Sequence, residues 1–206
     1  MSNVSRRRTG ELLRTLFGIL LKSPDGMPAS YALAALEKQV TLTEYEQGDY
    51  GSGGRRFEKI VRFATIDCVK AGWLIKNKGQ WSITEDGKAA LEKYKDSEEF
   101  YREAVKLYAQ WKSAQLSQDD DTEVEEDVLE KDVAITYEKA EEQAWGEIEQ
   151  YLRSMNPYDF QELVAELLRA MGYHVAWVAP PGKDGGLDIL AWTDPLGTRP
   201  PRIKVQ

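Results

Sequence analysis

Residues 180–206 read PPGKDGGLDILAWTDPLGTRPPRIKVQ, and this stretch decides how the second half of the chain is interpreted. Asp184 and Asp188 stand on either side of a Gly-Gly turn, and a short apolar run follows at 189–192. Short apolar runs bounded by Gly and Pro are typical of strands, so we predict strands at 189–192 and 203–206 with a turn between them. A carboxylate at the start of one strand of such a hairpin, with a polar residue on its partner, is a platform for Mg²⁺, which prefers hard oxygen ligands.

The residues before this stretch predict a helix and a further strand. Asn156 and Pro157 form a helix-start signal, and apolar residues then recur at helical spacing as far as Met171. Gly172 stops the helix, and residues 173–178 alternate as a strand does. We therefore expect an α/β fold on a mixed sheet in residues 151–206.

The first 95 residues follow the element order of a winged helix. Apolar spacing predicts helices at 11–21, 31–40 and 55–71, a β-hairpin at 73–83 and a last helix at 85–95. Basic residues lie on or before the third helix and on the hairpin, where a winged helix contacts DNA phosphates and guanine edges. These DNA-binding candidates are Arg55, Arg56, Lys59, Arg62, Lys76 and Lys78. An ordinary charged surface is the alternative interpretation.

Charge divides the chain into three parts. Residues 1–95 hold 16 Lys and Arg against 11 Asp and Glu, a net +5, whereas residues 96–150 hold 5 against 18, a net −13. Residues 151–206 hold 6 of each sign and are neutral. We predict a basic DNA-binding domain at 1–95, an acidic helical linker at 96–150 and a third domain at 151–206. The helices of the linker are expected at 96–116 and 134–151, with a solvated, flexible charge run at 118–126.

Two separate segments resemble one family. The helix that carries Phe160, the Gly172-Tyr173 pair, the Gly-Gly-x-Asp turn and the strand ending in Gln206 resemble the Mrr-type restriction endonucleases, the methylation-dependent branch of the PD-(D/E)xK nucleases. Residues 71–74, 80–84 and Gly87 resemble the N-terminal domain of the same family. The resemblance implies a mainly α chain whose last part is a restriction-endonuclease-like α/β core.

The resemblance also implies roles for individual residues. Asp188 would bind Mg²⁺ beside the scissile phosphate, and Gln206 would offer an amide oxygen where most of the superfamily has a carboxylate. Asp184 is either a further acid of the site or a turn residue. Glu162 and Glu166 would complete the metal site from the helix or lie on a solvated helix face, while Gln161 stands where the family often has Glu. The catalytic Lys of the Gln-x-Lys motif would lie beyond Gln206, so we expect this 206-residue chain to be inactive.

The resemblance implies a type IV restriction endonuclease that hydrolyses methylated double-stranded DNA with Mg²⁺. The alternative is a non-catalytic winged-helix DNA-binding or regulatory protein. Cys68 is the only cysteine, which suits a reducing cytoplasm, and no apolar run approaches the roughly 18 residues of a membrane span. We expect a cytoplasmic protein without a membrane partner, and a homodimer is left open.

Overall fold

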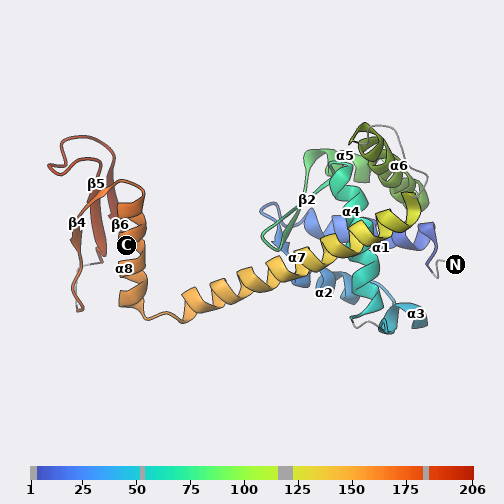
Figure 1. Ribbon diagram of the computed structural model, residues 1–206, viewed down its shortest axis with the longest axis horizontal. Coiled ribbons are helices and arrows are strands. Elements are labelled where there is room, and N and C mark those ends of the chain that lie inside the picture. Colours follow the sequence, from blue (N-terminus) through green and yellow to red (C-terminus); the bar gives the residue numbers. More distant parts are fainter. Residues whose placement is uncertain (1–3, 52–53, 116–122, 183–185) are drawn as a thin grey trace. The chain divides into compact units, whose positions relative to one another are not determined.

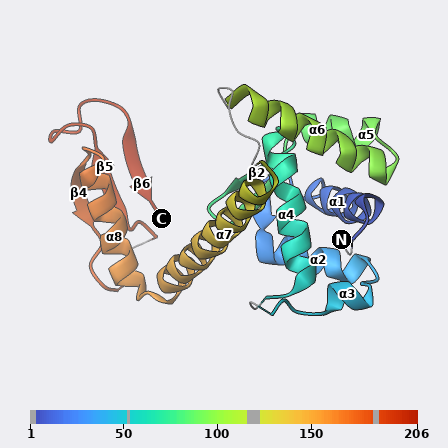
Figure 2. The ribbon, with the colours of Figure 1, turned by 45° about the vertical axis from the view of Figure 1, so that its right-hand side comes forward.

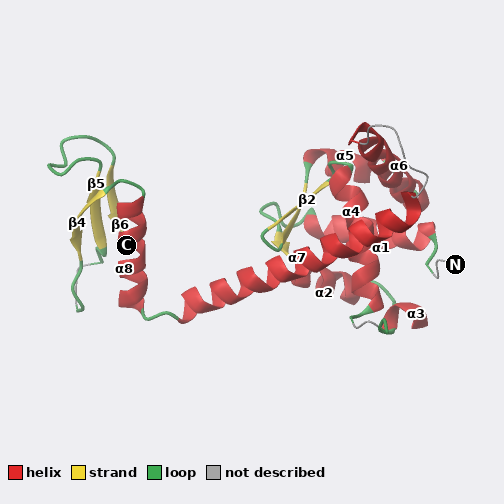
Figure 3. Cartoon of the chain, viewed as in Figure 1, coloured by secondary structure: helices red, strands yellow, loops and turns green. Residues whose placement is uncertain are grey.

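The computed structural model describes residues 4–51, 54–115, 123–182 and 186–206. Most of this described chain is helical, and its strands form two separate small sheets (Figure 3). The chain divides into two compact units, a first unit Met1–Trp145 and a second unit Gly146–Gln206. No helix among the described residues combines the length and the apolar character needed to cross a membrane.

The first unit consists of helices around a small sheet (Figure 1). Its elements are α1 (Arg6–Leu20), β1 (Met27–Pro28), α2 (Ala29–Gln39), α3 (Glu44–Gln47), α4 (Arg56–Lys70), β2 (Leu74–Asn77), β3 (Gln80–Ile83), α5 (Glu85–Lys93), α6 (Ser97–Gln115) and most of α7 (Glu123–Ser154). The predicted order of helices and hairpin is confirmed, and α3 is an additional short helix. The assignment as a winged helix stays a prediction.

The core of the first unit forms where α1, α2, α4 and the sheet meet. Leu13, Leu16 and Phe17 of α1 are fully buried, as are Phe57 of α4 and Trp81 of β3. Burying a large apolar side chain contributes about 1.5–3 kcal/mol, so these contacts fix α4 and the hairpin against the rest of the unit.

The hairpin between β2 and β3 is closed by a two-residue turn. Both turn residues have positive φ angles, 51° at Lys78 and 72° at Gly79, as a hairpin turn of the primed type requires. Strand β3 lies in the middle of the sheet and pairs antiparallel with both β1 and β2. The hairpin is therefore short and closely attached to the core.

Helix α6 packs directly on α1, although residues 96–150 were predicted to form a linker. Phe100 and Ala104 are fully buried, and the ring of Phe100 meets Phe17 edge-on at a centroid distance of 5.2 Å. Gly10 of α1 lies against the backbone of Ser97, the first residue of α6. The structure places no boundary at residue 95, and the division at 95 and 150 stays a prediction.

Helix α7 is longer than the predicted helix at 134–151. It begins at Glu123, within the charge run expected to be flexible, and residues 116–122 of that neighbourhood lie outside the described residues. The first part of α7 lies across α4 (Figures 1 and 2), to which the ion pair of Lys131 with Asp67 joins it at 2.7 Å. The first half of this acidic helix is therefore part of the first unit.

An ion pair ties the start of α1 to α3. The guanidinium of Arg8 donates two hydrogen bonds of 2.8 Å to the carboxylate of Glu46, which is 1% exposed. Glu46 also accepts a hydrogen bond from the backbone N–H of Thr43 in a capping box. Burial raises the pKa of Glu46, but the hydrogen bonds from Arg8 and Thr43 outweigh it and hold the pKa below its ordinary value.

The second unit places one helix on a three-stranded sheet. Its elements, after the end of α7, are α8 (Pro157–Ala170), β4 (His174–Val178), β5 (Ile189–Trp192) and β6 (Arg202–Val205). Asn156 caps α8 through its side-chain oxygen, which accepts a hydrogen bond of 2.9 Å from the N–H of Tyr158. The small core between helix and sheet contains Ala165, Leu168, Ile189 and Ala191.

The expectation of a mixed sheet is wrong for the described strands. The order is β4-β5-β6, and both pairings are antiparallel. Residues 179–188 and 193–201 separate consecutive strands, and each stretch is shorter than the crossover of a dozen or more residues that a parallel pair needs. The second unit is therefore a helix on an antiparallel sheet, with one edge of β6 and one of β4 lacking a partner strand among the described residues.

Candidate active site and nucleic-acid interface

A pocket of about 400 Å³ opens between α8 and the start of β5 in the second unit. Its lining residues come from the first turns of α8, from the loop after β4, and from the facing ends of β5 and β6. They are Pro157, Tyr158, Phe160, Gln161, Val164, Gly182, Asp188, Ile189, Val205 and Gln206. Most are apolar or neutral, and Asp188 is the acidic residue among them.

Asp188 and Gln206 line this pocket together because of the strand register. Ile189 pairs with Val205, and the backbone N–H of Asp188 donates to the carbonyl of Val205 at 2.9 Å. The side chain of Gln206 reaches the turn before β5, where a Cβ on Gly186 would lie 3.0 Å from its Nε2. The predicted pair of site residues is thus brought to one place, while Asp184 lies outside the described residues.

Gln161 is a pocket residue that the sequence interpretation did not include among the site candidates. Its Nε2 donates a hydrogen bond of 2.7 Å to the carbonyl of Ala179 and a longer one of 3.4 Å to the carbonyl of Asp188. It therefore joins α8 to the backbone at Asp188. The available signal was its place directly after Phe160, where the resembled family often has Glu.

Glu162 and Glu166 do not line the pocket. Both carboxylates form ion pairs with Arg169, at 3.3 Å in the case of Glu162, and all three side chains are well exposed. Neighbouring residues on a helix point about 100° apart, so Gln161 and Glu162 face different ways. This exposure is that of a solvated helix face, and a role of either glutamate in a metal site stays a prediction.

The donor set of the pocket fits a hard cation that keeps much of its water. Within the described part of the chain, no three His, Cys, Asp or Glu side chains gather into a metal-binding group. Asp188, which carries a carboxylate, and Gln206, which carries a neutral amide, both line the pocket. Mg²⁺ is commonly held by one or two carboxylates, with water and substrate phosphate completing its octahedron, so the residues present are compatible with it.

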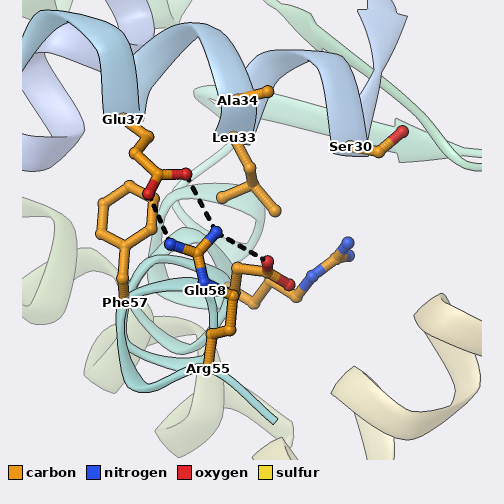
Figure 4. A pocket seen from close by; sticks show the side chains of 8 residues that line it. Ser30, Leu33, Ala34, Glu37, Arg55, Phe57 and Glu58 are labelled. Carbon is orange, nitrogen blue, oxygen red and sulfur yellow. Dashed lines mark hydrogen bonds and ion pairs between the residues drawn. The ribbon is translucent and has the colours of Figure 1, made fainter. Parts of the chain in front are cut away.

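Arg55, at the start of α4, turns toward α2 (Figure 4). Its guanidinium forms an ion pair with Glu37 and a second one, of 3.6 Å, with Glu58. The hydrogen bond from Arg55 lowers the pKa of Glu37. Arg55 remains 44% exposed at its side chain, so it is accessible to solvent but already paired.

Arg56 and Lys59 lie beside two tyrosine rings. The guanidinium of Arg56 lies 4.7 Å from the ring centroid of Tyr45, and the Nζ of Lys59 lies 5.1 Å from that of Tyr50. Lys59 also forms an ion pair of 2.9 Å with Asp132 of α7. Both residues are half-buried, so contact with a ligand would involve the aromatic groups around them as well.

Arg62, one of the predicted DNA-binding residues, is not exposed on the surface of its helix. Its side chain is buried and pairs with Glu138 at 2.6 Å and with Glu142 at 2.7 Å, both on α7. The sequence pattern of α4 could not reveal a second helix that covers this face. Arg62 also lies beside the hairpin, since its guanidinium is 5.5 Å from the ring centroid of Trp81 in β3.

The two lysines of the hairpin also meet α7. Lys76 pairs with Glu138 at 2.7 Å, and burial lowers the pKa of Lys76 although the carboxylate opposes that change. Lys78 is exposed, with its Nζ 4.7 Å from the ring centroid of Trp145. The structure thus gathers Lys59, Arg62, Lys76 and Lys78 on one face, which we call the basic face, and places α7 against it.

Two family models match the chain. The Mrr N-terminal domain matches residues 11–93, and the restriction endonuclease model Mrr_cat matches residues 152–206. The two matches cover separate parts of the chain, in the first and the second unit respectively. No curated protein and no solved structure matches the chain.

Proposed function

The chain belongs to the Mrr-type restriction endonucleases, and on that premise we propose that it binds double-stranded, methylated DNA with the first unit and holds Mg²⁺ for phosphodiester hydrolysis with the second. The observation that carries the catalytic part is the pocket shared by Asp188 and Gln206.

In this proposal three side chains of the second unit, those of Asp188, Gln206 and Gln161, build the site for the substrate phosphate. Asp188 and Gln206 would hold Mg²⁺, and the bound ion would supply positive charge beside the phosphate oxygens. Gln161 positions the backbone of Asp188 through its hydrogen bonds to the carbonyls of Ala179 and Asp188. The apolar side chains of Phe160 and Val164 also line the pocket.

In the first unit the proposal assigns DNA binding to α4 and the β2–β3 hairpin, as the two parts of a winged helix. The support is the gathering of cationic side chains from both elements on the basic face. Cations of this kind neutralise DNA phosphates and release counterions, which makes binding strongly dependent on salt. Arg56 adds a guanidinium that can stack or donate to guanine edges.

The metal site is tested by titrating the chain with Mg²⁺ or Mn²⁺ in a calorimeter. Asp188→Asn should weaken metal binding at least about tenfold, because it removes the carboxylate of a site with few ligands. Asp159→Asn is a matched control, since Asp159 is an exposed acid of α8 in the same unit and does not line the pocket. Equal affinities in the two variants would contradict the assignment of Asp188.

DNA binding is tested separately, by fluorescence anisotropy with a short duplex that does or does not carry methylated bases. The proposal expects measurable binding that weakens steeply with salt and is tighter for the methylated duplex. Asp188→Asn should leave this binding unchanged, because Asp188 lies in the second unit. In any polypeptide that contains both units and cleaves DNA, the same substitution should abolish cleavage.

A further inference from the structure

Helix α7 packs with its charged side inward and an apolar stripe outward. Its buried side chains include Lys131 and Glu138, each less than 10% exposed, with Ile135 between them. The outward stripe runs at steps of four residues and is between 64% and 70% exposed, and it consists of Leu129, Val133 and Tyr137. A helix held permanently on a protein surface normally buries its apolar stripe, so charge rather than apolar burial holds α7 in this place.

The carboxylates of α7 follow the basic face in a row. Asp132, Glu138 and Glu142 pair with cationic side chains of α4 and β2. A helix rises 1.5 Å per residue, so the three positions are separated by about 9 and 6 Å along the axis. Phosphates of one DNA strand follow each other every 3.4 Å along the duplex axis, so these intervals correspond to about 2.6 and 1.8 phosphate steps.

Neutral donors of the first unit take part in the same contact. The indole N–H of Trp81 donates to Glu138 at 2.9 Å, and the backbone N–H of Ser30, at the start of α2, donates to Glu142 at 2.8 Å. A phosphate oxygen can accept both kinds of hydrogen bond as a carboxylate does. The groups around α7 are therefore those that a DNA backbone would need.

One buried hydrogen-bond donor in the contact between α7 and the basic face has no partner among the described residues. Among the described residues, the Nε of Arg62 is buried and has no hydrogen-bond partner, although both of its other nitrogens are paired. A buried donor without a partner disfavours the state that contains it. In the ion pair of Lys131 with Asp67, the cation lies on α7 and the carboxylate on α4, which is the reverse of the other pairs. The part of α7 that presents carboxylates as DNA presents phosphates therefore begins at Asp132.

We propose that the segment of α7 from Asp132 to Trp145 occupies the DNA-binding face of the first unit in place of DNA, and that DNA must displace it. This inference rests on the proposed DNA binding by α4 and the hairpin. A protein whose binding-competent state is only fractionally populated binds its ligand more weakly by that fraction. The docked helix therefore lowers the apparent affinity for DNA and favours duplexes that make enough contacts to replace it.

The first experiment removes the imitation charges from the full chain. Glu138→Gln with Glu142→Gln should tighten binding of a 25-base-pair methylated duplex, by about tenfold if the docked state is about 90% populated in the wild type. Glu130→Gln with Glu141→Gln is the matched control, because it changes the net charge equally on the same helix and none of the contacts above. The control should bind within about twofold of the wild type, since distant charges are screened.

The second experiment fixes α7 on the basic face without relying on the stability of those variants. A Cβ built on Gly79 would lie 3.2 Å from the Cβ of Glu142, a few tenths of an ångström short of the usual separation in a disulfide. In the full chain with Gly79→Cys and Glu142→Cys, oxidation should lower DNA affinity at least about tenfold and reduction should restore it. The oxidised and the reduced samples are the same variant, so any strain from a side chain at position 79 is present in both. The native Cys68 is fully buried, which keeps it from pairing with the introduced cysteines.

The outcomes separate this inference from the proposed function. Tighter binding by the Glu138 and Glu142 variant, or weaker binding by the oxidised cysteine pair than by the reduced one, supports displacement. If the wild type binds DNA but oxidation changes nothing, α7 does not cover the DNA-binding face and the inference is wrong, while DNA binding by the first unit stands. If neither the wild type nor the reduced cysteine variant binds DNA at any salt concentration, both fail.

Discussion

Exchanging Gly10 for Ala tests whether α6 lies on α1. A Cβ on Gly10 would overlap the backbone carbonyl of Ser97, whose carbon lies 2.5 Å from the position of the new atom. The obstacle is backbone on both sides, so no side-chain rotation relieves it and the two helices must move apart. Overpacking of this kind typically costs about 1–3 kcal/mol, and the helix preference of Ala returns at most about 1 kcal/mol.

The displacement also disturbs the aromatic contacts between these helices. Phe100 meets Phe17 and, at a centroid distance of 5.0 Å, Trp73, and such pairs contribute about 0.5–1.5 kcal/mol each beyond their burial. The net effect of Gly10→Ala is therefore a loss of about 2–3 kcal/mol. For a unit of this size that corresponds to a fall of roughly 4–12 °C in the melting temperature.

Gly18 provides the matched control because it lies in the same helix with nothing within 4 Å of the site of a Cβ. Gly18→Ala should raise the stability by about 0.5–1 kcal/mol through the lower entropy of the unfolded chain. Thermal and urea denaturation of the full chain, followed by tryptophan fluorescence, measure both variants. Two variants that both gain stability would show that α6 is not held on α1 and that the linker interpretation of residues 96–150 was the better one.

Two further expectations follow from the ionic groups of the first unit. Glu46→Gln should cost about 2 kcal/mol at pH 7, since it breaks the buried pair with Arg8, and chemical denaturation at several pH values should show this cost shrinking in acid. The pKa of Glu46 is lowered in the folded state. The stability that this carboxylate contributes is therefore fully present above its unfolded pKa, near 4.3, and is lost as the pH falls through its folded pKa. A cost of the substitution that grows in acid would refute the assignment. Arg56→Ala combined with Lys78→Ala should reduce the salt dependence of DNA binding by about one unit of log–log slope for each phosphate that is no longer neutralised, whereas Lys106→Ala on α6 should leave the slope unchanged.

Local signals in the sequence located most elements of the fold. Asn156 begins α8 and Thr84 begins α5, each by capping the helix as its residue type favours, and Gly72 follows the end of α4. The hairpin turn at Lys78 and Gly79 was equally local. Signals of this kind act within a few residues, so they can be recognised without knowing the tertiary structure.

Contacts between distant segments were the part that the sequence did not reveal. Arg62 has the spacing of an outward residue on α4, and only the presence of Glu138 and Glu142, more than 70 residues later, makes it a buried one. The long α7 was underestimated because its inward side is charged, so apolar spacing gave no sign of its packing. In the second unit, Gln161 belongs to the pocket through hydrogen bonds to carbonyl groups, which leave no mark on composition or spacing.

The polar character of the α7 contact has a consequence for its response to temperature. Large heat-capacity changes come from the exposure of apolar surface, and the exposure of polar surface changes the heat capacity in the opposite direction. From Asp132 to Trp145 the buried apolar side chain of α7 is that of Ile135, while Val133 and Tyr137 are already exposed in the docked helix. Release of this segment would therefore change the heat capacity very little, and its free energy would follow temperature almost linearly. The balance between docked and released α7 would then lack the pronounced curvature that governs the unfolding of the core beneath it.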